Sequence, residues 1–151
     1  MQVKIKAIYI SPGHDFVGRF GKERLDHGYS TMDTVTCDAG MGIVGDRYYN
    51  HKEDFKGQIT FISEEVVISL QKELGLREIE AHQLRRNVLV AGIDLNELIG
   101  VTFRIDGAVF YGMEECRPCK WMNQSVGEGA LPALVGKGGL SCSDINDVVI
   151  R

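Results

Sequence analysis

Apolar and polar residues alternate along several short segments of this chain, which is the pattern of half-buried β-strands. Two of these segments, 101–105 and 109–113, lie on either side of Gly107, and this arrangement predicts a β-hairpin. The segments predicted as strands are 3–9, 58–62, 86–90, 101–105, 109–113 and 147–151. We therefore expect a chain built mainly from short strands.

One longer segment, residues 64–74, has the period of an amphipathic helix instead. Ser63 precedes it as a suitable N-cap, and Gly75 follows it as a suitable C-terminal stop. Its first turn is acidic, which suits the positive end of the helix dipole. Its expected buried stripe consists of Val67, Leu70 and Leu74.

Short strands, eighteen glycines and a single long helix indicate a mainly β fold, a β-rich barrel with helical insertions. The chain has 151 residues, for which one domain is the default. We therefore expect a single domain over residues 1–151.

Charge and composition exclude several classes of protein. The net charge of −4 argues against a nucleic-acid-binding surface. No apolar run approaches the roughly 20 residues that a membrane span needs, and the N-terminus lacks the form of a secretory signal. Four unevenly spread cysteines do not suggest a disulfide framework. We expect a cytoplasmic protein with reduced thiols and with neither nucleic acid nor membrane as a partner.

The stretch from residue 115 to residue 120, E-C-R-P-C-K, is where sulfur chemistry is expected. Pro118 suits the first turn of a helix, because the N–H that proline lacks would be unsatisfied there. Cys119 would then lie at a helix start, where free N–H groups and the macrodipole favour a thiolate. Arg117 and Lys120 flank it with positive charge. A thiolate attacks, carries sulfur or binds metal, so Cys119 is the candidate nucleophile and metal ligand.

Three other interpretations of the neighbouring cysteines stay open. Cys116 and Cys119 would make half of a zinc site, but Cys37, Cys142 and His82 stand alone and supply no evident second half. A redox Cys-x-x-Cys motif is convincing beside a βαβ pattern, which the sequence does not show. Buried, inert thiols are the third interpretation.

Two adjacent arginines, Arg85 and Arg86, are candidates for binding an anion. In a strand, adjacent side chains point to opposite faces, so only one of them would face a pocket. Asn87 would share the face of Arg85, and a guanidinium and an amide two residues apart suit one shared anion. A solvated pair at the entry to a strand explains the arginines equally well.

The glycine-rich stretch 40–45, with Asp46 and Arg47 after it, has the look of a phosphate-binding loop. It lacks the Walker Lys-Ser/Thr pair and the dinucleotide spacing. Turns that need positive φ explain these glycines better. We expect Asp46 and Arg47 to form a structural ion pair or to anchor the loop.

Taken together, several motifs resemble those of the MOSC family, the domain named after the C-terminal part of molybdenum-cofactor sulfurase. Their order and spacing match over most of residues 1–139. The matching segments are Gly-Ile-Val-Gly-Asp-Arg at 42–47, Gly-Gln-Ile-Thr-Phe-Ile-Ser-Glu at 57–64, Arg-Arg-Asn-Val-Leu-Val at 85–90, Gly-Ile-Asp-Leu at 92–95, Leu-Ile-Gly at 98–100 and Cys-Arg-Pro-Cys at 116–119. The chain departs from the family at Tyr48, where a histidine is common, and after Gly139, where its tail is shorter and more acidic.

The resemblance implies a closed β-barrel of the pyruvate-kinase barrel type. It also implies that Cys119 carries sulfur as a persulfide, or ligates molybdenum held by a pterin dithiolene. It places Arg85 and Asn87 at the anion end of the cofactor pocket. The full set of residues expected to bind the cofactor is Arg85, Asn87, Arg117, Lys120, Asp46 and Arg47.

We therefore expect a sulfur relay. Cys119 takes sulfane sulfur from a donor persulfide and passes it on, with Cys116 as a resolving thiol. The expected donor is a cysteine desulfurase, which carries pyridoxal phosphate, or another sulfur donor. The expected acceptor is a molybdoenzyme or a molybdopterin-type molybdenum cofactor that is bound transiently.

Two other functions stay open from the sequence. One is an oxidoreductase with permanently bound molybdenum and Cys119 as the metal ligand. The other is a non-catalytic module that recognises the cofactor or a partner protein.

Overall fold

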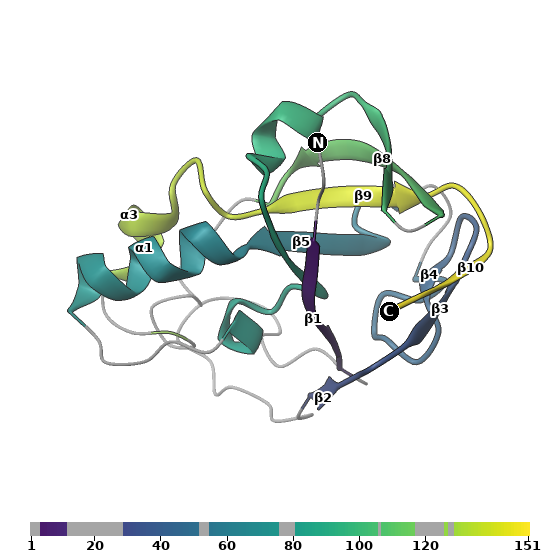
Figure 1. Cartoon of the computed structure of the whole chain (residues 1–151), viewed down its shortest axis with the longest axis horizontal. Coiled ribbons are helices and arrows are strands. Elements are labelled where there is room, and N and C mark those ends of the chain that lie inside the picture. The colour runs from purple at the N-terminus through teal and green to yellow at the C-terminus, as the bar shows by residue number, and fades with distance from the viewer. Residues whose placement is uncertain are drawn as a thin grey trace.

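The computed structural model describes residues 4–11, 29–51, 55–75, 81–105, 107–116, 126 and 129–151. Within these ranges the chain forms short strands and few helices (Figure 1). The strands are β1 (Lys4–Ile10), β2 (Ser30–Thr31), β3 (Val35–Asp38), β4 (Gly42–Ile43), β5 (Ile59–Ser63), β6 (Val88–Ala91), β7 (Thr102–Ile105), β8 (Ala108–Glu115), β9 (Leu140–Asp144) and β10 (Val148–Ile150). The helices are α1 (Glu64–Leu74), α3 (Ala130–Leu134) and the 3-10 helices η1 (Ala81–Leu84) and η2 (Leu95–Leu98).

The described strands form two sheets. The larger sheet has seven strands in the order β2-β1-β6-β5-β9-β8-β7, and the smaller has three in the order β10-β3-β4. Strands β5 and β6 pair in parallel, with Phe61 opposite Val88, and α1 is part of the connection between them. The other pairs of strands are antiparallel.

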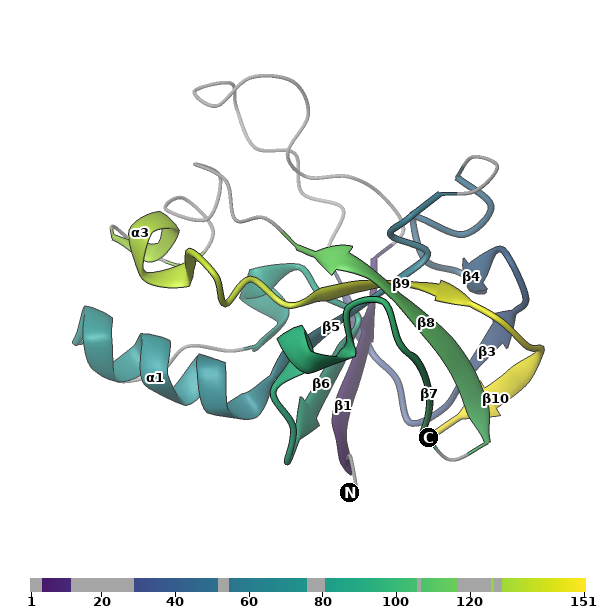
Figure 2. The same ribbon diagram turned by 90° about the horizontal axis from the view of Figure 1, so that it is seen from above.

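One hydrophobic core joins the two sheets. Phe61 and Phe110 of the larger sheet are fully buried, and they belong to the same cluster as Cys37 and Ile150 of the smaller one. The ring centroids of Phe61 and Phe110 lie 5.3 Å apart, and the two rings meet edge to face. A second cluster fills the space between the larger sheet and the two α-helices, which lie side by side in Figures 1 and 2. The two faces of the larger sheet therefore have different partners.

Helix α1 begins and ends where the sequence predicts. The Ser63 side chain accepts a hydrogen bond from the N–H of Val66, at 3.1 Å, and Gly75 adopts the left-handed conformation with φ 66°. Val67 and Leu70 are buried, as expected. The hairpin around Gly107 is also confirmed, as β7 and β8, and the predicted C-terminal strand is β10.

The prediction of a closed barrel is wrong. Within the described part of the chain, the larger sheet ends at β2 on one side and β7 on the other, and these edges do not pair with each other. Strand β2 has two residues, both exposed, so it offers little backbone for a closing ladder. Strands β3 and β10 pair with each other instead, and they cover the core as a separate sheet. Two open sheets thus enclose the core.

Glycines allow the backbones of separate segments to approach closely. The φ of Gly112 is not in the left-handed region, but an added Cβ at this residue would collide with the carbonyl oxygen of Leu98. The Gly112 carbonyl accepts the N–H of Gly100 at 2.8 Å, and its N–H donates to Val101 at 3.0 Å. Gly112 therefore holds η2 against β8.

We predict that Gly112→Ala destabilises the protein by about 2–3 kcal/mol, because the methyl group has no room and backbone must move. Gly107→Ala is the control, since an added Cβ there meets nothing within 4 Å and only its φ of 85° is unfavourable. It should cost about 1 kcal/mol. Urea unfolding measures both values, and equal losses would contradict the close approach.

Candidate functional site

A row of polar side chains crosses four strands on one face of the larger sheet. Thr60 of β5 lies opposite Ser141 of β9 in the antiparallel register. On one side, Thr60 hydrogen-bonds to Asn87, which directly precedes β6. On the other side, Ser141 Oγ lies 3.1 Å from Sγ of Cys116, which directly follows β8. The row places Cys116 and Asn87, both predicted site residues, on the same face.

Asn87 is the most constrained member of this polar row. The Oδ1 atom of Asn87 accepts two hydrogen bonds from Thr60, one from its backbone N–H at 3.0 Å and one from its hydroxyl at 3.1 Å. Its Nδ2 donates to the carbonyl of Tyr9 at 3.2 Å. Because Asn87 is only 2% exposed, these bonds replace water contacts that burial removes. The side chain thus ties β1, β5 and the start of β6 together.

Cys116 is anchored by its backbone as well as its side chain. Its N–H donates to the carbonyl of Gly139 at 2.9 Å, next to the start of β9. The residue is 8% exposed. The Ser141 hydroxyl is the polar partner of its thiol. Cys116 is therefore a fixed point three residues before Cys119.

A second polar network lies at the end of β1. Asp46 Oδ1 accepts the N–H of Ser11 at 3.0 Å, and its Oδ2 accepts the N–H of Tyr48 at 3.3 Å. Its carboxylate also pairs with the Arg47 guanidinium at 3.5 Å, and both side chains are buried. The predicted ion pair and loop anchor are confirmed. Since Asp46 neutralises Arg47, this pair holds the loop in place.

Arg85 belongs to this second network, but it does not lie on a strand as predicted. It follows η1 with a left-handed φ of 61°, and β6 begins only at Val88. Its Nη2 donates to Ser11 Oγ at 3.3 Å, and its carbonyl accepts a bond from Arg47 Nη2 at 3.1 Å. The prediction that Arg85 and Asn87 share one strand face is wrong, because a 3-10 turn precedes them in place of extended chain.

Three predicted site residues, Arg117, Cys119 and Lys120, lie outside the described residues, as does the predicted helix start at Pro118. Sequence reasoning missed Thr60, Ser141 and Ser11. Polar residues at alternate positions of otherwise apolar strands are the signal that marks the first two, but only the β5–β9 register brings them together.

The other two cysteines, Cys37 and Cys142, are core residues. Burial, with smaller contributions from Asp144 and Asp38, raises the pKa of the Cys37 thiol to about 12. Burial also raises the pKa of Cys142 far above its usual value, with a smaller contribution from Cys116. Neither residue is measurably exposed. Both thiols are therefore protonated near neutral pH, and both are buried in the folded structure.

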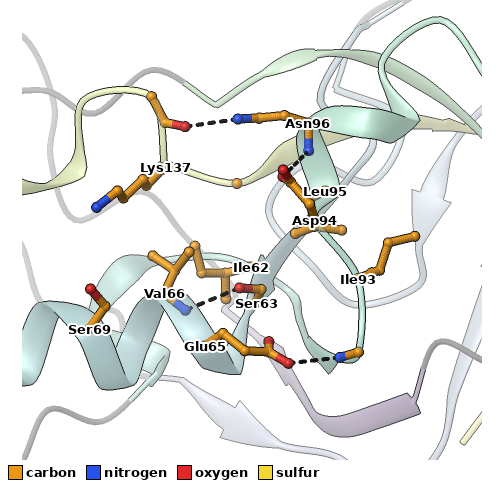
Figure 3. Close-up of a pocket in the computed structure, with 13 residues that line it drawn as sticks. Ile62, Ser63, Glu65, Val66, Ser69, Ile93, Asp94, Leu95, Asn96 and Lys137 are labelled. Carbon is orange, nitrogen blue, oxygen red and sulfur yellow. Dashed lines mark hydrogen bonds between the residues drawn. The ribbon is translucent and has the colours of Figure 1, made fainter.

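A pocket of about 640 Å³ lies beside the first turns of α1. Figure 3 shows its apolar floor, which includes Ile62 and Leu95, and its polar rim. Glu65 accepts the N–H of Gly92 at 2.8 Å on that rim, and this hydrogen bond lowers the pKa of its carboxyl. The described residues that line it are Ile62, Ser63, Glu65, Val66, Ser69, Gly92, Ile93, Asp94, Leu95, Asn96, Gly136, Lys137 and Gly139.

None of the predicted site residues that the structure describes lines this pocket. Its nearest link to the polar row is Gly139, whose carbonyl accepts the N–H of Cys116. The rim carries both signs of charge, with Glu65 and Asp94 against Lys137. The pocket and the polar row are therefore two separate features of the sheet.

The described ranges contain no group of three or more His, Cys, Asp and Glu side chains arranged to hold a metal ion. They also contain no helix with the length and hydropathy needed to cross a bilayer.

Comparison with known proteins shows a sequence match and several structural ones. The family model of the MOSC domain matches residues 44–141. The structure is similar to that of the YuaD protein from Bacillus subtilis, with a TM-score of 0.80, 21% identity, and coverage of 100% of this chain and 92% of that one.

YiiM from Escherichia coli is also similar, with a TM-score of 0.69, 16% identity, and coverage of 100% of this chain and 66% of that one. For YiiM from Geobacillus stearothermophilus the TM-score is 0.63, the identity 14% and the coverage 99% and 71%. No match was found among curated protein sequences.

We predict that Asp46→Ala destabilises the protein by about 3 kcal/mol, because it leaves the buried Arg47 guanidinium and two backbone N–H groups without their acceptor. Asp46→Asn keeps one acceptor oxygen and should lose less. The exposed Asp33→Asn is the control. Urea unfolding measures the free energy of unfolding of the three variants. Equal values for Asp46→Ala and Asp33→Asn would contradict the anchoring role.

Proposed function

The chain belongs to the MOSC domain family, and on that premise we propose that it is a sulfur carrier in which Cys119 holds the transferred sulfur as a persulfide. Cofactor assembly or metal–sulfur metabolism is the setting that this family suggests. The proposal needs one thiol that ionises near neutral pH and is accessible to a donor.

The observation that supports Cys119 is the burial of the other thiols. Cys37 and Cys142 lie in the core with raised pKa values, so neither is a nucleophile near neutral pH. Cys116 is 8% exposed and hydrogen-bonded to Ser141. Its neighbour in sequence, Cys119, stands between Arg117 and Lys120, whose charges favour a thiolate.

The loading step conserves atoms and electrons without an added oxidant. The Cys119 thiolate attacks the outer sulfur of a donor persulfide, and a new S–S bond forms as the donor's S–S bond breaks. The donor leaves as a thiolate with the bonding electron pair. The donor that this chemistry requires is a protein or small-molecule persulfide, and a pyridoxal-dependent cysteine desulfurase is one such source.

Two routes unload the sulfur. An acceptor nucleophile attacks the outer sulfur, and Cys119 leaves as a thiolate. Alternatively, the Cys116 thiolate attacks the inner sulfur, which releases hydrosulfide and forms a Cys116–Cys119 disulfide. We assign Cys116 this resolving role, and Ser141 the role of orienting its thiol through the contact at 3.1 Å.

The family also implies a molybdopterin-type cofactor, and the described residues fit it only at one position. The Arg85 guanidinium, beside the Ser11 hydroxyl, offers the donors that a phosphate accepts. Arg47 is paired with Asp46, and the amide of Asn87 is committed to Thr60 and Tyr9. We give Arg47 and Asn87 structural roles, and we assign Arg85 to an anionic acceptor because the family resemblance places it at the anion end of the cofactor pocket. When bound, such a cofactor would supply the metal centre that receives sulfur.

We predict that incubation with a persulfide donor adds one sulfur, about 32 Da, to the intact protein. The gain should disappear in Cys119→Ala and persist in Cys116→Ala, because the first residue carries the sulfur and the second only releases it. Cys142→Ala is a matched control at a buried thiol, and it should also keep the gain. Intact-mass spectrometry measures all four proteins.

A mass gain that survives the loss of Cys119 would overturn the assignment. Elemental analysis separates the remaining functions. Stoichiometric molybdenum in protein from a molybdenum-competent host would favour an oxidoreductase with Cys119 as ligand. An absence of both sulfur loading and molybdenum would favour a binding module.

We predict that Arg85→Glu weakens the binding of inorganic phosphate about tenfold, which is equivalent to about 1.4 kcal/mol. The guanidinium donors are lost and a like charge replaces them. Arg104→Glu is the control, because Arg104 lies exposed on β7. Phosphorus NMR titration measures both, and equal affinities would remove Arg85 from the anion site.

A further inference from the structure

Asp144 is a buried carboxyl group at the place where the two sheets meet. It is the last residue of β9 and only 3% exposed. Its N–H donates to Gln58 Oε1 at 2.8 Å, next to β5, and its carbonyl accepts the N–H of Gly40 at 2.8 Å, in the turn after β3. Figure 2 shows β9 continuing through this region into β10, with β3 alongside. Its backbone therefore joins the larger sheet to the smaller one.

The side chain of Asp144 lacks the partners that a buried carboxylate needs. Neither carboxylate oxygen has a hydrogen-bond partner among the described residues. No lysine, arginine or histidine in the same ranges forms an ion pair with it. A buried charge without a partner is strongly unfavourable, whereas the protonated carboxyl is neutral. The environment therefore selects the protonated form.

The titratable groups that face Asp144 add negative charge. Strand β3 contributes Cys37 and Asp38, and the turn between β9 and β10 contributes Asp147. Asp38 is hydrogen-bonded to the Tyr49 hydroxyl, and Asp147 accepts the N–H of Ala39 at 2.7 Å. The neighbours of Asp144 on the core side are uncharged. They are Gln58, which precedes β5, and Phe110 of β8, which lies opposite Asp144 in the register.

We propose that Asp144 is a proton-controlled joint between the two sheets: the protonated side chain allows β9 to pack against β3, and loss of the proton loosens that contact and exposes Cys37. Ionisation would place a charge among Asp38, Asp147 and the core. Cys37 is the natural reporter, because it lies on β3 beside this carboxyl and is fully buried.

The titration has a definite direction. Burial, with smaller contributions from Asp147 and Asp38, raises the pKa of Asp144 to about 7. The N–H of Asn146 opposes the rise without forming a hydrogen bond of normal geometry. In the unfolded chain the pKa is about 4. The folded state thus holds a proton that the unfolded state releases, so this stabilising effect is complete below pH ~4 and is lost as the pH rises through about 7.

The test compares the wild-type protein with Asp144→Asn, which stays neutral at every pH. The alkylation rate of Cys37 is measured from pH 6 to pH 8.5 and divided by the rate of the asparagine variant at the same pH, which removes the pH dependence that does not come from Asp144. We expect this ratio to rise at least tenfold across the range. The exposed Asp33→Asn is the control and should behave like the wild-type protein.

Carbon-13 NMR of the Asp144 carboxyl in the wild-type protein provides a second readout that does not require the variant to fold. A midpoint near neutral pH supports the proposal. A midpoint near the ordinary aspartate value of about 4 would overturn it. A ratio of Cys37 rates that stays constant from pH 6 to pH 8.5 would overturn it as well.

Discussion

The arrangement of this protein depends on one buried amide. Asn87 bonds to both the backbone and the hydroxyl of Thr60, and to the carbonyl of Tyr9, so three strands meet at a single side chain. The parallel pair β5–β6 begins at this point. The antiparallel register of β5 and β9 then places Thr60 opposite Ser141. Ser141 in turn contacts the Cys116 thiol. Cys116, which directly follows β8, is thus positioned by a series of contacts that begins at Asn87 and passes through Thr60 and Ser141.

The two faces of the larger sheet separate inert sulfur from candidate reactive sulfur. Cys37 and Cys142 lie on the side of the shared core, where burial keeps their thiols protonated. Cys116 lies at the end of the polar row, on the other face, beside a hydroxyl. Hydrocarbon packing on one face and paired polar groups on the other would let this sheet combine a rigid core with the thiol chemistry that we propose.

Local signals in the sequence predicted local structure well. The Ser63 cap, the Gly75 stop and the glycine between β7 and β8 act over a few residues, and all three predictions were confirmed. The closed barrel depends on pairing between distant edges, which alternation along a strand does not specify. Arg85 was misplaced because its left-handed backbone follows a 3-10 turn that no glycine marks. The polar row and the orphan carboxyl of Asp144 need the register of β9 and so were beyond a reading of single segments.

The central claim is that one thiol in this chain is reactive while the core thiols are not. The direct measurement is the rate at which iodoacetamide alkylates each of the four cysteines in the native protein at pH 7, followed by peptide mass spectrometry. We predict that Cys119 reacts faster than a free cysteine, whereas Cys142 reacts only after unfolding and Cys37 reacts far more slowly than Cys119. A rate at Cys119 equal to that of the core thiols would contradict it.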